Sequence, residues 1–134
     1  MTSATAVALE VGMDYPGAVI SVGHCYRHAN GRKYLHREAR RWRDDLARSL
    51  GWCLVERGLR GVALATPLLV RIDAAYRDEA HATDPNNLCK LVYDAVEAAT
   101  GINDRHMQPE QGEVVYGVGI PGIVVTVTVR PKGA

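Results

Sequence analysis

The feature that most constrains the fold of this chain is a segment with apolar residues at helical spacing, which follows a segment of alternating apolar and polar residues. From Asn86 to Thr100 the apolar residues recur at helical spacing. They are Leu88, Leu91, Val92, Ala95, Val96 and Ala99. Just upstream, Pro67–Tyr76 alternates, so that Arg71 and Asp73 point away from the apolar residues between them. A strand with one wet face and a helix with one apolar face predict a helix packed on a sheet.

The rest of the chain extends this architecture. We expect an opening strand at Ala4–Val11 and a long helix at Arg37–Glu56, with Gly51 as a weak point inside the helix. The expected core stripe of that helix is Ala39, Trp42, Leu46, Leu50 and Cys53 or Leu54. Glu113–Val118 and Ile123–Val129 predict a C-terminal hairpin. The 134 residues therefore predict one α+β domain, residues 1–134, with two helices on one mixed or antiparallel sheet.

Polar side chains follow one side of the second predicted helix. Asp84 is typical of its N-cap, and Pro85 of its first residue, where the missing amide hydrogen costs nothing. Asn86, Lys90 and Asp94 then follow at steps of four residues and stack along one face. Two interpretations stand: a cap with an exposed ion pair between Lys90 and Asp94, or a site in which these groups act together.

The turn after this helix carries further polar groups that could belong to such a site. Gly101 ends the helix, and Asn103 and Asp104 follow, so that a second acid can fold back beside Asp84. Oxygen ligands of this kind suit Mg²⁺ or Mn²⁺, which activates water and neutralises an oxyanion. Lys90 would add a donor for the charge that develops on a phosphoryl group. An ordinary turn at Asn103 and Asp104 is the alternative.

Two blocks of sequence together resemble the RusA family of Holliday-junction resolvases. The first block matches through Asp84, Asn86-Asn87-Leu88, Lys90, Asp94-Ala95 and Asn103-Asp104. The second block, Ser21–Ala47, has a Tyr-Arg-His and Gly-Arg loop that leads into a long helix with an aromatic residue and an arginine. With the strand between the blocks and the expected closing hairpin, the similarity covers most of the chain.

This resemblance implies a homodimeric, magnesium-dependent endonuclease that nicks branched DNA, such as four-way junctions, at two active sites. Asp84 and Asp104 match metal-binding acids of the family, and Lys90 matches its catalytic lysine. Asn86 stands where the family usually has a second Asp, and it offers one carbonyl oxygen without charge. The loop before Asp84 is also less basic than is usual in the family. These departures motivate an alternative, a catalytically weakened relative that binds branched or single-stranded DNA as an accessory factor.

The distribution of charge indicates where DNA would bind. The formal net charge is only +1, but basic residues concentrate between positions 27 and 48. In the first part of this run, Tyr26 can stack on a base or sugar and the cations can contact phosphates without reading sequence. These candidate contacts are Tyr26, Arg27, Arg32, Lys33 and Arg37. For the helical part of the run, a solvated face of i,i+4 ion pairs is an equal alternative.

Cysteine usage and the amino terminus indicate a compartment. Cys25, Cys53 and Cys89 are odd in number and lack metal-like spacing, and the first residues lack the regions of a signal peptide. We expect reduced thiols and a cytoplasmic location. No run approaches membrane-spanning length, so no membrane partner is expected. Of the five histidines, His106 alone lies close enough to Asp104 in sequence to assist as a base or ligand.

Overall fold

The computed structural model describes residues 5–14, 26–29, 32–35, 37–78 and 88–133, with the backbone alone for 26–29 and 32–35. The elements are β1 (Val7–Asp14), β2 (Tyr26–Ala29), β3 (Arg32–Leu35), α1 (Arg37–Glu56), β4 (Leu68–Tyr76), α2 (Cys89–Thr100), the short 3₁₀ helix η4 (Asp104–His106), β5 (Met107–Glu110), β6 (Val114–Tyr116) and β7 (Gly122–Val129). The predicted bounds of α1 are confirmed.

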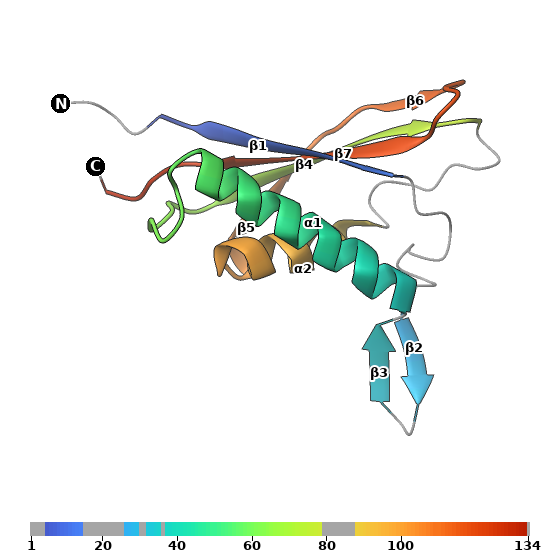
Figure 1. The fold of residues 1–134 in the computed structure, drawn as a ribbon, viewed down its shortest axis with the longest axis horizontal. Helices are drawn as coiled ribbons and strands as arrows, with labels where there is room; N and C mark the ends of the chain where they lie inside the picture. The colour runs from blue at the N-terminus through green and yellow to red at the C-terminus, as the bar shows by residue number, and fades with distance from the viewer. Residues whose placement is uncertain (1–4, 15–25, 30–31, 36, 79–87, 134) are drawn as a thin grey trace.

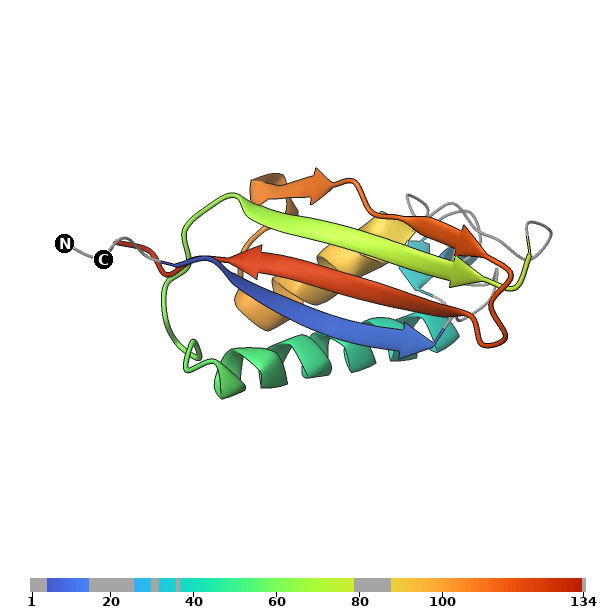
Figure 2. The ribbon, with the colours of Figure 1, turned by 90° about the horizontal axis from the view of Figure 1, so that it is seen from above.

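Five strands form one mixed sheet. Its order is β1-β7-β4-β5, and β6 pairs with β4 further along the same edge. β7 is antiparallel to both β1 and β4, whereas β5 and β6 are parallel to β4. Both helices cover one face of this sheet, and no other helix or strand of the described residues covers the opposite face, called the open face below (Figures 1 and 2). The expectation of an α+β domain with two helices on one mixed sheet is confirmed.

The core lies between the two helices and the sheet. Burial alternates strictly along β4, with every second residue from Leu68 to Tyr76 buried, while Arg71 and Asp73 are only half-buried on the open face. The predicted stripe of α1 is buried at Ala39, Trp42, Leu46, Leu50 and Leu54, and Cys53 is half-buried beside it. The stripe of α2 is buried from Leu88 to Val96. Each fully buried Leu or Val contributes about 1.5–3 kcal/mol, so these stripes hold the two layers together.

The predicted C-terminal hairpin is wrong. β6 pairs with β4, in the register Ala74 to Val114, and β7 pairs with the opposite edge of β4. The connection between β6 and β7 therefore passes the end of β4 (Figure 2). Alternation of apolar residues specifies which side chains face the core, but it does not specify which strand is the neighbour. Here β6 and β7 each pair with one edge of the central strand β4 instead of with each other.

Three other elements differ from the expectation. β1 ends at Asp14 instead of Val11, because its whole length pairs with β7, from Val7 on Val129 to Asp14 on Gly122. β5 was not expected, since Met107–Glu110 contains a proline and only four residues. The hairpin of β2 and β3 was not expected either. Its sequence signal is the Asn-Gly pair at positions 30 and 31, a strong indicator of a two-residue hairpin turn.

A clasp joins the open face of β4 to the segment before β6. Asp73 Oδ1 accepts a hydrogen bond from the Glu113 amide at 2.7 Å, and the Ala74 amide donates to the Glu113 carbonyl at 2.9 Å. Arg71 Nε donates to Asp73 at 3.0 Å. Partial burial alone would raise the pKa of Asp73, but the Arg71 hydrogen bond and the Glu113 amide together hold that pKa below its ordinary value.

The clasp predicts an acid-dependent loss of stability. A carboxyl whose pKa is lower in the folded state stabilises the fold above its unfolded pKa, about 3.9, and loses this contribution as the pH falls through the folded value. We expect the difference in unfolding free energy between the native protein and Asp73→Asn to be constant from pH 5 to 7 and to shrink below about pH 4. Urea unfolding at a series of pH values measures it. A difference that grows toward low pH would contradict this prediction.

Candidate functional site

The helix that carries the predicted site begins and ends at defined residues. Leu88 occupies the N-cap of α2 without a side-chain cap, and Gly101 ends the helix with φ 77°, its amide donating to the Glu97 carbonyl at 2.7 Å. The predicted helix end is thus confirmed, because the left-handed conformation favours glycine. Asp84, the predicted N-cap and metal ligand, lies outside the described residues, and so does Asn86, the predicted neutral ligand.

Lys90 is exposed in the first turn of α2, and Asp94 is half-buried one turn further on. Their four-residue spacing puts both on one side of the helix, away from the buried stripe. An exposed ammonium at this point is accessible to a ligand from solvent. The position also lies near the positive end of the helix dipole, which favours an anion there.

Asp104 lies past the opposite end of the helix. The side chain of Asn103 caps η4 by accepting a hydrogen bond from the Arg105 amide at 3.1 Å, and Asp104 is the exposed first residue of η4. Three residues later Met107 pairs with Leu68, the first residue of β4. Along the helix axis, the ten steps from Lys90 to Thr100 amount to about 15 Å. Asn103 therefore serves as the cap of η4.

Tyr93 links the two ends of this region. Its pKa is raised, chiefly by burial and further by the nearby Cys89 and Asp104. The carboxylate of Asp104 is therefore within electrostatic range of Tyr93, which stands one turn from Lys90. In the part of the chain that the structure describes, no three His, Cys, Asp or Glu side chains gather as a metal site. Because Asp84 and Asn86 are not among those residues, the metal site stays a prediction.

The imidazole of His106 is also engaged locally. Arg105 Nε donates to His106 Nε2 at 3.2 Å, and both side chains are exposed. This hydrogen bond engages one of the two ring nitrogens, so a role of His106 as a base or ligand stays a prediction. The structure therefore gives His106 a surface contact beside Asp104.

The predicted DNA contacts lie on one hairpin and at the start of one helix. Tyr26 and Arg27 belong to β2, Arg32 and Lys33 to β3, and Arg37 is the exposed first residue of α1. The register pairs position 29 with 32 and position 28 with 33. In Figure 1 this hairpin extends away from the sheet beside the start of α1. The side chains of the hairpin lie outside the description, so their contact with DNA stays a prediction.

Further along α1 arginines do pair with acids, but not at the expected spacing of four residues. Arg43 bonds to Asp44 at 3.0 Å, and Arg48 bonds to Asp45 at 3.1 Å. Arg40 and Arg41, nearer the start of the helix, are exposed. The first turns of α1 are thus the part that can present positive charge to a phosphate backbone, whereas the later arginines are neutralised by neighbouring acids.

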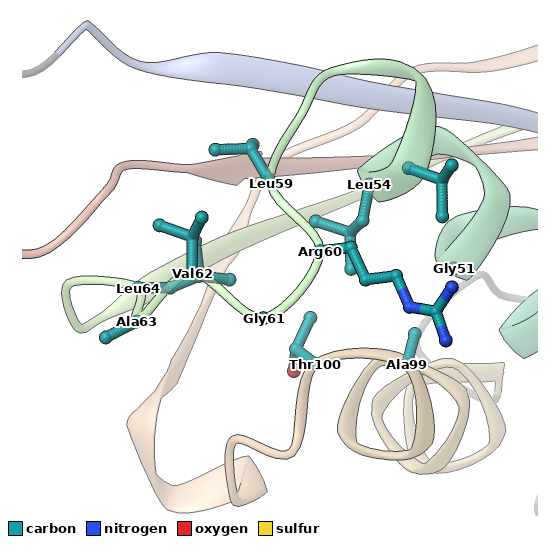
Figure 3. Close-up of a pocket in the computed structure, with 11 residues that line it drawn as sticks. Gly51, Leu54, Leu59, Arg60, Gly61, Val62, Ala63, Leu64, Ala99 and Thr100 are labelled. Carbon is teal, nitrogen blue, oxygen red and sulfur yellow. The ribbon is translucent and has the colours of Figure 1, made fainter.

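A pocket of about 550 Å³ lies at the far end of both helices, between the ends of α1 and α2 and the loop from Leu59 to Leu64 (Figure 3). Most of its lining residues have apolar side chains, and the polar side chains among them are those of Arg60 and Thr100. Thr100 Oγ1 already donates to the Val96 carbonyl and accepts from the Ile102 amide. The pocket therefore offers no nucleophile or acid-base pair, and it is not the predicted site.

No protein-family model matches this chain, and no curated protein matches its sequence. The family resemblance therefore depends on the two sequence blocks alone. Neither helix has the length and apolar character that crossing a membrane requires, within the part of the chain that the structure describes.

Proposed function

We propose that this protein is a magnesium-dependent endonuclease of the RusA type, which acts as a homodimer on branched DNA such as four-way junctions. Asp84 and Asp104 hold the metal ion, Asn86 supplies a neutral oxygen, and Lys90 stabilises the negative charge that develops on the phosphoryl group. The hairpin of β2 and β3 and the start of α1 contact the phosphate backbone. When bound, Mg²⁺ supplies an activated water and neutralises charge.

The observation that carries this proposal is the position of Lys90. The lysine is exposed in the first turn of α2, directly after the connection from the end of β4. α1 and α2 both begin at the end of the sheet where β4 finishes (Figure 2). Two helix N-termini, exposed arginines on the first turns of α1 and the exposed Lys90 thus occur at one end of the molecule. Such a concentration of positive potential attracts a phosphodiester and favours the anionic transition state.

A second candidate function is an accessory protein that binds branched DNA without cutting it. The specific observation in its favour is that Asp104 follows the C-terminal end of α2 while Lys90 stands in the first turn, with Asn103 used as a cap. The neutral Asn86 also removes one negative charge from the metal ligands. Under this alternative, the basic hairpin and the start of α1 retain their DNA contacts.

One experiment separates these functions. A labelled four-way junction and a linear duplex of the same length are incubated with the protein in Mg²⁺, Mn²⁺ or a chelator. If the protein is a nuclease, we expect paired nicks in the junction with either metal, and no nicks in the chelator or in the duplex. Salt-sensitive binding of the junction without nicks in either metal supports the accessory protein instead. If the protein neither binds nor nicks the junction, both functions are rejected.

A further inference from the structure

We infer that the outer edge of β1, together with Trp52 of α1, is the surface through which two copies of this chain pair, in an antiparallel register centred on Val11. A homodimer is part of the proposed function, but this interface requires neither DNA nor metal. It can therefore be tested even if the nuclease proposal fails.

β1 is the end strand of the sheet. Within the part of the chain that the structure describes, its eight residues pair with β7 on one side only. The strand contains no proline, so each residue on its outer side presents an amide and a carbonyl. Such an edge is a template for another strand, and a second copy of the same strand can add to it antiparallel about a two-fold axis.

An apolar groove runs beside this edge. Three consecutive residues of β1, Glu10, Val11 and Gly12, line it together with the facing side of α1. On α1 the lining residues are Arg48, Ser49, Trp52 and Cys53. The Trp52 side chain is 64% exposed, whereas Trp42 on the same helix is only 7% exposed. An exposed indole beside an unpaired strand edge is typical of a contact surface.

The charges on β1 select the register. In a two-fold pairing centred on Glu10, this carboxylate would face its own copy, and in one centred on Gly12 it would face Asp14. Like charges opposite each other destabilise a sheet. Of the registers centred on the three residues that line the groove, only the one centred on Val11 sets Glu10 opposite Gly12. That glycine has no atom within 4 Å of the position of a Cβ, so the space beside it is open.

The same register completes the groove. With the two-fold axis at Val11, the Trp52 side chains of both copies flank the axis, because each lines the groove at positions 10 to 12. Each indole can then cover apolar surface of the other copy, while Leu9 of one strand lies opposite Met13 of the other. The two sheets become one continuous sheet with the helices on the same face. Self-complementarity at a two-fold axis is what identifies the partner as a second copy of the chain.

Opposite charges at position 12 test the register. Sedimentation velocity over a concentration series, without DNA or metal, measures the dimer dissociation constant. Gly12→Glu creates two repulsive pairs with Glu10 in each dimer, and we expect the dissociation constant to rise about threefold to tenfold. Gly12→Lys creates two attractive pairs, and the constant should fall by a similar factor. The double variant Glu10→Lys with Gly12→Glu should restore tight pairing.

Matched controls separate the interface from general effects of charge. Gly119 is exposed and also has no atom within 4 Å of a Cβ position, so Gly119→Glu and Gly119→Lys should leave the constant unchanged. Trp52→Ser should raise the constant about tenfold or more, whereas Ile120→Ser, at a side chain that is 87% exposed, should not. Circular dichroism checks that each variant is folded.

A protein that stays monomeric at every concentration, or a constant that moves in the same direction for Gly12→Glu and Gly12→Lys, would overturn the inference. A dimer with the expected charge response that never nicks a junction would reject the nuclease and leave the interface standing.

Discussion

Replacing Lys90 with alanine is expected to lower the rate of magnesium-dependent junction nicking about 100- to 1,000-fold, with little change in junction binding. The lysine is exposed in the first turn of α2, so its removal leaves the buried stripe of that helix intact. Its proposed interaction forms with charge that develops only in the transition state. The loss should therefore appear in the single-turnover rate, while the dissociation constant for the junction changes less than about twofold.

The matched control for this variant is Lys132→Ala, which removes another exposed lysine, far from Lys90 in sequence. We expect no change in nicking there. Asp104→Asn should also abolish nicking if its carboxylate holds the metal, and raising the concentration of Mn²⁺ should rescue part of the activity in this variant but not in Lys90→Ala. Nicking at the native rate in Lys90→Ala would reject the assignment of Lys90, and the same result in Asp104→Asn would reject Asp104 as a ligand.

The layers of this fold follow from local periodicity. The helical stripes from Ala39 to Leu54 and from Leu88 to Val96, and the strict alternation from Leu68 to Tyr76, all face the core as expected. Apolar burial is the largest favourable term in folding, and its period is fixed by backbone geometry, so the sequence records it directly. The end of α2 at Gly101 was predictable for a similar local reason, because few other residues tolerate its positive φ.

Local periodicity predicts neither which strands pair with each other nor which side chains meet in the candidate site. The position of β6 depends on the free edge of β4 and on the clasp between Asp73 and Glu113, residues 40 positions apart in sequence. No local pattern encodes such a contact. The same limit applies to the candidate site, since acids near helix ends are common and their convergence depends on tertiary structure. The sequence could place Lys90 on an exposed helix face and Asp104 after the end of that helix, but it could not show whether the Asp104 carboxylate folds back toward Asp84.

Gly112→Ala is expected to destabilise the protein by about 3 kcal/mol, a large share of the 5–15 kcal/mol that is typical of small domains. A Cβ at this position would collide with the backbone carbonyl of Ile72 in β4 and press on the Asp73 carboxylate. Backbone atoms in a central strand cannot yield, so the segment between β5 and β6 would have to move away from β4. Urea unfolding measures the loss, and Gly51→Ala is the control, because an alanine in open space inside α1 should stabilise the fold by about 0.5–1 kcal/mol.

The physical cause of that loss can be isolated with a double variant. If the segment leaves β4 in Gly112→Ala, the bond between Asp73 Oδ1 and the Glu113 amide is already broken, so adding Asp73→Asn should cost almost nothing further. In the native background the same Asp73→Asn change should still destabilise the protein near neutral pH, because it removes the charge that Arg71 and the Glu113 amide stabilise. Additive effects of the two substitutions would show that the clasp survives the added methyl group and that the collision is relieved elsewhere.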